Sequence, residues 1–365
     1  MFRRSMRARL AAFFAVAMAL PHHLAPAAAQ DSPPLSPAEK IYADLANLPQ
    51  DERQRRLEEG ARKEGQLVVV DAMNGEEVAA HGAMFRKRYP FIDLQMTNLG
   101  SQDAADRLLA EETARRHLTD ALDASLPDLR SLLNNNYLAR YPTPVTAAIL
   151  PQYKGFLDPQ NRWVPWFWSE HGISYNTNLV PPDKAPKQWF DLCSPFFKGN
   201  VSFDPAEVRY LTGLYTMLGE AQTEALLKCM GENDPIIQRG HLQRLQLMLA
   251  GDHMVQGDNY LYNGLAIQRK NPSTPYAIVY SAPVLGYGAA VEINRNTPHP
   301  YAAALFADFG LAQESQEWIA SLLRGPLAIK HPYLPPETKI VTYADADPDL
   351  VQRLLDYWRK YMEKR

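Results

Sequence analysis

Cysteine is scarce in this sequence, because only Cys193 and Cys229 occur among 365 residues. Two cysteines cannot form a zinc site alone, and no nearby pair of histidines completes one. Because no cysteine precedes Cys193, a lipid-anchored cysteine at the N-terminus is excluded. The two side chains could form a disulfide or lie buried as small hydrophobic groups. In either case we expect them in the same lobe, close enough for a bond.

Apolar runs long enough to cross a bilayer are also missing. The run at Leu10–Leu20 is shorter than the roughly 20 residues that a membrane span needs. Arginines precede this run, and Ala27–Ala29 follow it. This order predicts a secretory signal peptide over residues 1–29, with cleavage before Gln30; an uncleaved anchor is the alternative. We therefore expect an exported protein that resides in the periplasm.

The sequence has no excess of positive charge. The net charge is −3, and it falls to −7 once the four arginines of the predicted signal peptide are removed. Nucleic-acid phosphates need a basic face, so a nucleic-acid partner is not expected. Hydrophobic residues make up 46% and charged residues 22% of the chain, an ordinary balance for a globular protein.

Common catalytic motifs are missing as well. There is no GxSxG, no GxGxxG after the first predicted strand, no phosphate loop and no HExxH. Asp71, Asp204 and Asp258 follow predicted strands, where they could form the acid and base of a secreted hydrolase or simply cap helices. His81 is expected on the surface or partly buried. We predict no catalytic residue, no metal ligand and no cofactor.

An α/β pattern is clearly present. Leu67–Val70 is a continuous apolar run typical of a strand buried on both faces, and Ala121–Ser125 is another strand candidate. Helical segments between such strands predict a parallel sheet with right-handed crossovers. The pattern starts again at Gly199–Asp204, after a segment rich in proline and tryptophan that we expect to be irregular. Two α/β lobes with a cleft between them explain this doubling best.

Polar groups at strand ends and aromatic residues near the lobe junctions are the candidate solute ligands. Helix starts with free backbone N–H groups bind polar or anionic groups, and we expect Ser101 to cap one such helix. Tyrosine rings offer flat apolar area with a polar tip. The candidate ligand-binding residues are Asn74, Ser101, Tyr175, Asp204, Tyr260 and Tyr287.

Four segments in order resemble extracellular solute-binding proteins of the iron(III)-binding-like group. They are Leu57–Val69, Ile173–Val180, Trp189–Leu192 with Phe197–Val201, and Ala303–Phe309 with Gln316. The resemblance implies a two-lobed type II periplasmic-binding fold, with an ABC permease in the inner membrane as partner. We expect a monomer that closes on a small-molecule solute as a hinged trap.

The resemblance also implies the domain boundaries. We expect the signal peptide at 1–29, a leader with an N-terminal helical extension at 30–65, and the first lobe at 66–170 and 288–335. The second lobe with its crossover strands is expected at 171–287, and a C-terminal helical tail at 336–365.

The iron-binding members use adjacent tyrosines, and here Leu261 follows Tyr260 where the second tyrosine would stand. Their histidine and glutamate fall near Gly75 and Ser125. Ferric iron needs several hard anionic oxygens, and Tyr262 lies two residues on, where it would face elsewhere. We therefore expect an organic or oxyanion solute, with ferric iron as the alternative.

Overall fold

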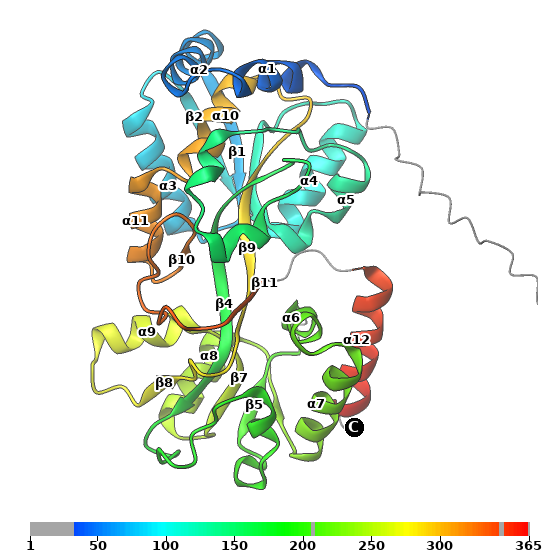
Figure 1. Cartoon of the computed structure of the whole chain (residues 1–365), viewed down its shortest axis with the longest axis vertical. Helices are drawn as coiled ribbons and strands as arrows, with labels where there is room; N and C mark the ends of the chain where they lie inside the picture. The colour runs from blue at the N-terminus through cyan, green and yellow to red at the C-terminus, as the bar shows by residue number, and fades with distance from the viewer. Residues whose placement is uncertain (1–32, 206–208, 343–346, 364–365) are drawn as a thin grey trace, which may run out of the picture. The chain divides into compact units, whose positions relative to one another are not determined.

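A computed structural model describes residues 33–205, 209–342 and 347–363 of the chain. The predicted signal peptide, residues 1–29, lies outside these ranges. From Leu35 onward the chain forms one compact unit built around a mixed β-sheet flanked by helices (Figure 1). Within the described ranges, no helix combines the length and the apolar character that a membrane crossing requires.

The first part of the sheet is parallel, as the sequence predicts. Strand β1 (Gln66–Asp71) lies between β2 (Asp93–Asn98) and β3 (Ala121–Ser125), and Asp71 is level with Asp123. Helices α3 (Gly75–Arg88) and α4 (Ser101–Thr113) make the crossovers. The expected helix cap at Ser101 is wrong, because Gly100 is the capping position and Ser101 is the first helical residue.

Two long antiparallel strands run through the centre of the sheet (Figure 1). They are β4 (Val164–Asn176) and β9 (Val284–Ile293), and they pair from Val164 opposite Val291 to His171 opposite Leu285. The tryptophan-rich residues that we expected to be irregular are therefore the first part of strand β4. Its residues are almost all buried, so no polar alternation marks it as a strand in the sequence.

The second part of the sheet is assembled on the other edge of β4. Strand β7 (Val255–Tyr260) pairs antiparallel with β4 and parallel with β5 (Val201–Phe203), and β5 pairs with β6 (Ile236–Ile237). The remaining strands are β8 (Tyr276–Ile278), β10 (Gly325–Pro326) and β11 (Ile340–Thr342). The helices of this part are α6 (Arg209–Leu218), α7 (Glu220–Glu232), α8 (His241–Ala250) and α9 (Leu261–Lys270).

Separate hydrophobic clusters form the cores of the two ends of the sheet. The first holds α1 (Pro37–Ala46), α2 (Gln50–Glu64), α10 (Pro300–Phe309) and α11 (Gln313–Ser321), and the second holds α12 (Pro348–Tyr361). Helix α5 (Arg130–Asn134) is short and follows β3. We call the two ends the first and second lobes; their expected boundaries stay a prediction.

The rear face of β4 is tied to a later segment of the chain. Along a strand, alternate side chains point to opposite faces, so Trp168 and Glu170 lie opposite Phe167 and Ser169. Glu170 accepts a hydrogen bond from Nε2 of buried His331, and the Trp168 and His331 rings lie 5.9 Å apart. The backbone N–H of Leu334 donates to Nδ1 of His331 over 3.2 Å, which fixes the tautomer that donates to Glu170.

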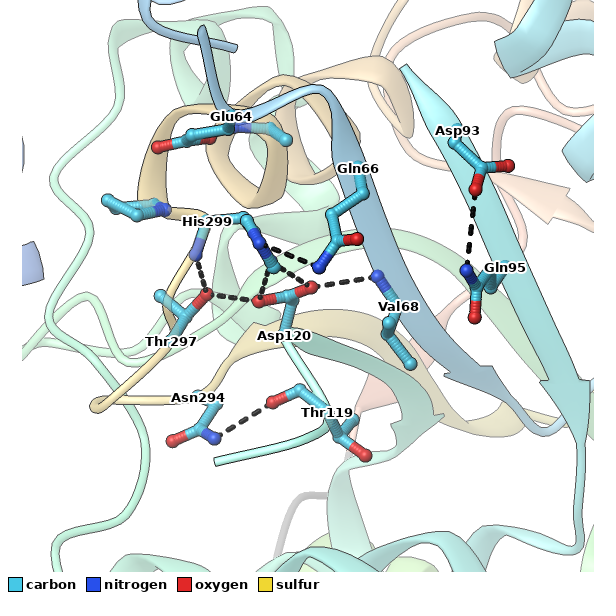
Figure 2. Close-up of polar contacts among 12 residues, drawn as sticks. Glu64, Gln66, Val68, Asp93, Gln95, Thr119, Asp120, Asn294, Thr297 and His299 are labelled. Atoms are coloured by element: carbon cyan, nitrogen blue, oxygen red, sulfur yellow. Dashed lines mark hydrogen bonds and ion pairs between the residues drawn. The ribbon is translucent and has the colours of Figure 1, made fainter. Parts of the chain in front are cut away.

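A cluster of polar side chains closes the edge of the first lobe where β1 and β3 begin. Figure 2 shows the Asp120 carboxylate at its centre, with Val68 N–H donating over 2.8 Å and the Thr297 hydroxyl over 2.6 Å. His299 Nδ1 lies 3.0 Å from the same carboxylate. The hydrogen bond to Asp120 raises the pKa of His299 despite its partial burial. The cluster thus holds the chain leading into α10 against the sheet.

The Asp120–His299 pair should make stability depend on pH. Because the folded-state pKa of His299 is raised, its contribution is fully present below the unfolded pKa of about 6.5 and is lost as pH rises through the folded value. His299→Gln should therefore lower the unfolding free energy at pH 5.5 by about 1–2 kcal/mol, with a smaller loss at pH 9. Urea titrations at both pH values measure this. An equal loss at both would contradict it, and in an Asp120→Asn background the pH-dependent part should vanish.

Cys193 and Cys229 form a disulfide within the second lobe, with Cα atoms 5.4 Å apart. Cys229 lies in α7, and Cys193 ends the 3₁₀ turn Trp189–Cys193. The expectation that the two lie close enough for a bond is confirmed.

Loss of this disulfide should destabilise the second lobe. The bond joins residues 36 apart in sequence, and closing such a loop is worth about 3–4 kcal/mol on the chain-entropy model. The double variant Cys193→Ser/Cys229→Ser should lose about that much unfolding free energy in guanidinium titrations. Reducing agent should shift the wild type in the same direction and leave the double variant unchanged. Two reactive thiols in unreduced, denatured wild type would contradict the bond.

Candidate solute-binding site

A polar cavity of about 110 Å³ lies where the parallel strands of the first lobe end. Strands β1 and β3 end at this edge of the sheet, and ligands of open α/β sheets bind beyond the carboxyl ends of such strands. Its lining residues are Ala72, Met73, Asn74, Asp123, Ala124, Ser125, Phe167, Ser169, Tyr287, Ala289 and Arg324. The cavity is therefore bounded by β4 and β9 as well as by the end of the first lobe's parallel strands.

The turn from β1 into α3 forms one wall. The Asn74 side chain accepts a hydrogen bond from the Glu77 N–H over 3.0 Å and so caps α3. Asn98 donates to the carbonyl oxygens of Asp71 and Met73, which fixes the turn against the end of β2. The positive end of the α3 dipole is thus held beside the cavity.

Hydroxyl groups supply much of the remaining polar surface. Ser125 and Ser169 come from β3 and β4, and Ser101 supports the first by accepting the Ser125 N–H over 2.9 Å. Tyr287 on β9 also lines the cavity, and its hydroxyl lies 2.8 Å from that of Tyr260 at the end of β7. Tyr260 thereby links the second lobe to the cavity wall without lining it.

Arg324 is the only arginine or lysine in the cavity lining, within the described part of the chain. It donates to Glu77 over 2.9 Å, and its guanidinium lies 4.9 Å from the Tyr262 ring centroid and 5.5 Å from that of Phe167. Its Nε is buried and has no hydrogen-bond partner among the described residues. Arg324 follows α11 and immediately precedes β10, whose pairing with β4 positions it.

A buried acidic cluster underlies the cavity. The Asp71 carboxylate accepts the Met73 N–H over 2.8 Å, and its other oxygen lies 3.4 Å from Nδ1 of His81. His81 is fully buried, contrary to our expectation, with its ring stacked on Trp166 at 4.7 Å. The ligand atoms of Asp71, His81 and Asp123 lie within 4.8 Å of one another, so these side chains could hold a metal ion.

Asp123 connects this cluster to the cavity. Its Oδ1 accepts the Trp166 indole N–H over 3.2 Å, whereas its Oδ2 has no partner among the described residues. Burial, and next the charge of Asp71, raise the pKa of Asp123 well above its usual range. Glu292, on the adjacent strand β9, is buried too, and burial raises its pKa well above the usual range. An isolated negative charge on Asp123 is therefore costly until a cationic group binds.

The structure brings together only part of the set chosen from the sequence. Asn74 and Tyr287 line the cavity, and Ser101 and Tyr260 each contact a lining residue. Tyr175 instead lies near the other end of β4, level with Val255 and Ala277. It is not among the cavity's lining residues.

The strand-end acids do not form a single group. Asp204 accepts the Gly240 N–H over 2.7 Å, and its own N–H donates to Asp258 over 3.3 Å. Asp258 pairs with buried Arg244 at 2.9 Å. Both lie in the second lobe, whereas Asp71 lies beside Asp123 in the first, so the three acids are divided between two structural networks.

Only Asn74 and Tyr287 among the lining residues were chosen from the sequence. The polar and aromatic lining residues that it missed are Asp123, Ser125, Phe167, Ser169 and Arg324. Asp123 lies within a recognised strand, and its alignment with Asp71 was available from the parallel pattern. Phe167 and Ser169 were missed because the first part of β4 was not recognised as a strand. Arg324 carries no sequence signal, because its position depends on pairing between β10 and β4, which are about 150 residues apart.

Comparisons with solved structures support the fold. The iron-bound HitA of Pseudomonas aeruginosa is 18% identical, with a TM-score of 0.66 over 81% of this chain and 99% of that one. AfuA of Actinobacillus pleuropneumoniae, with fructose-6-phosphate bound, is also 18% identical, with a TM-score of 0.60 over 82% and 99%. The spermidine/putrescine-binding protein PotD of Streptococcus pneumoniae is 17% identical, with a TM-score of 0.63 over 82% and 98%. At these identities the likeness shows the type II periplasmic-binding fold alone.

No curated protein sequence matches the chain. A family profile does match: that of the bacterial extracellular solute-binding proteins covers residues 128–337, more than half of the chain. The matched region contains β4, β9 and Arg324 and so includes a large part of the cavity wall. The chain therefore belongs to the family of bacterial extracellular solute-binding proteins.

Proposed function

We propose that this protein is the periplasmic receptor of an ABC import system and that it captures a small organic anion in the cavity beside Arg324. The family supports the receptor role, and the solute is then passed to a permease in the inner membrane. The structural neighbours bind ligands as different as iron and fructose-6-phosphate, so the solute class is argued from this chain's own residues.

The observation that carries the proposal is the state of Arg324. Its guanidinium is largely buried, one nitrogen is paired with Glu77, and Nε has no hydrogen-bond partner among the described residues. A buried donor without a partner costs free energy, which an incoming acceptor would recover. Because Arg324 lines a cavity that also borders the start of α3, an anionic oxygen fits both groups.

The neighbouring groups suit an organic solute. Hydroxyls of Ser125, Ser169 and Tyr287 can donate or accept, so they can bind the remaining oxygens of a carboxylate, phosphate ester or phosphonate. Phe167 provides an apolar surface for a carbon skeleton. This combination of one cation, several hydroxyls and one aromatic ring fits an organic anion better than a bare metal ion.

Loss of the Arg324 charge should weaken capture of every anionic solute. A thermal-shift screen of carboxylates, phosphate esters and phosphonates identifies binders, because a receptor gains about 2.7 kcal/mol at a hundredfold excess over Kd. For each binder, Arg324→Gln should lower affinity by roughly 10- to 150-fold, the value of a charged hydrogen bond. The control Arg88→Gln, which breaks a surface pair with Glu314, should bind like the wild type. Unchanged affinity in Arg324→Gln would refute the proposal.

Ferric iron is the second candidate, and the adjacent hydroxyls of Tyr260 and Tyr287 favour it. The two oxygens lie 2.8 Å apart, and the Tyr260 ring centroid lies 4.1 Å from that of His171 and 4.6 Å from that of His241. A second phenol therefore stands beside Tyr260, although it comes from β9 rather than from the next residue. Phenolate oxygens are hard ligands that suit Fe³⁺.

Tyr260→Phe separates the two candidates. For an organic anion, the variant removes the hydrogen bond that orients Tyr287, so affinity should fall by up to about tenfold. The purified wild type should also be colourless, with iron absent by elemental analysis. A coloured wild type that loses its colour and its iron in Tyr260→Phe would instead establish the ferric receptor.

A further inference from the structure

Two side chains of opposite charge share the cavity, and each has a buried polar atom without a hydrogen-bond partner among the described residues. These atoms are Oδ2 of Asp123 and Nε of Arg324. Asp123 is only 2% exposed, so the missing partner cannot be supplied by bulk water. The proposed anion accounts for Arg324 and leaves Asp123 without a partner. From this imbalance we infer that the solute is a small zwitterion whose ammonium group binds Asp123 while its anionic group binds Arg324.

The surroundings of Asp123 show why a cation belongs there. Asp71 stands level with it on β1, so a second carboxyl group lies beside it inside the lobe. The Arg324 and Glu77 charges also act on Asp123, and they are already paired with each other. An ammonium group would offset this local excess of acid and would donate directly to Oδ2.

The neighbouring histidine, His81, contacts Asp71 rather than Oδ2 of Asp123. His81 lies against the Asp71 carboxylate, and its ring is held between Trp166, 4.7 Å away, and Phe309, 5.7 Å away. Asp71 is therefore engaged by His81 and by the Met73 N–H, whereas Oδ2 of Asp123, a residue of the cavity lining, has no partner among the described residues. A metal ion held by Asp71, His81 and Asp123 is the alternative occupant, because their ligand atoms lie within 4.8 Å of one another.

The cavity wall suits an ammonium group for a second reason. Phe167 and Tyr287 both line it, and the faces of aromatic rings attract cations. The volume of about 110 Å³ corresponds to a solute of few heavy atoms, so the two charges of the solute must stand close together. Amino acids with a short spacer and aminophosphonates have this form.

This inference rests on the proposed function, because it assigns the second end of the same solute. The test compares zwitterions with analogues that lack one charge. Isothermal titration calorimetry at pH 7 would use β-alanine, 4-aminobutanoate and 2-aminoethylphosphonate, with propanoate, butanoate and ethylphosphonate as analogues without the amine. The wild type should bind at least one zwitterion at least tenfold more tightly than its analogue. Equal binding of every pair, or no binding of any zwitterion, would overturn the inference.

Substitution of Asp123 then tests whether this residue causes the preference for the zwitterion over its analogue without the amine. Asp123→Asn keeps the size of the side chain and removes the charge, so it should bind the zwitterion and its analogue equally while retaining affinity for the analogue. The control Asp103→Asn alters an exposed acid in the first turn of α4 and should keep the preference. If Asp123→Asn kept the preference, Asp123 would be acting as a neutral hydrogen-bond donor, and the inference would fail.

The remaining variants separate this inference from the proposed function. Arg324→Gln should lower the affinity for the zwitterion and for its analogue alike. If neither affinity changed, the proposed organic-anion receptor itself would be refuted. Thermal shifts with ZnCl₂ and MnCl₂ test the metal alternative. A rise in melting temperature in the wild type that is lost in Asp123→Asn would assign the cluster to a divalent cation and overturn the zwitterion. The comparison of analogues in the wild type stands even if a variant fails to fold.

Discussion

The antiparallel pairing of β4 with β9 is the interaction on which the rest of the structure depends. Each strand passes from one hydrophobic cluster to the other, so this ladder connects the cores of both lobes. The same two strands supply Phe167, Ser169, Tyr287 and Ala289 to the cavity. Close packing makes the ladder intolerant of change, because a Cβ at Gly286 would overlap the Trp168 ring. Fold and binding site therefore depend on one set of backbone hydrogen bonds.

Much of the fold could be predicted from local patterns, and the exceptions have a physical cause. Leu67–Val70 identifies β1, and Ala121–Ser125 identifies β3, because a short run of buried residues leaves a short-range signature. The tryptophan-rich first part of β4, residues 164–171, leaves none, since burial on both faces removes polar alternation and tryptophans are equally common in irregular segments. The tail helix α12 was recognised because one of its faces meets α7 and the other meets solvent.

The site was less accessible to sequence reasoning than the fold. Asn74 could be chosen because a strand followed by a helix cap has a local signature, and the structure places it in the cavity wall. Arg324 and Asp123 could not be chosen together, since they are about 200 residues apart and meet only through the pairing of β10 with β4 and of β3 with β9. Tyr175 was chosen for its place near a lobe junction, but register decides which end of a strand a residue occupies. Local composition therefore proposes candidates, and long-range pairing selects among them.

The alternation of side chains along β4 has a practical consequence. Phe167 and Ser169 face the solute cavity, whereas Trp168 and Glu170 face the rear, where His331 holds the strand. The rear side chains of β4 therefore connect the strand to a second, larger hollow of about 590 Å³ that is lined by Tyr153, Lys330 and His331. An environment-sensitive dye attached at Lys330 would sit outside the binding cavity, next to His331, which contacts Glu170 of β4. The architecture thus offers a built-in attachment point for an optical sensor of whatever this receptor carries.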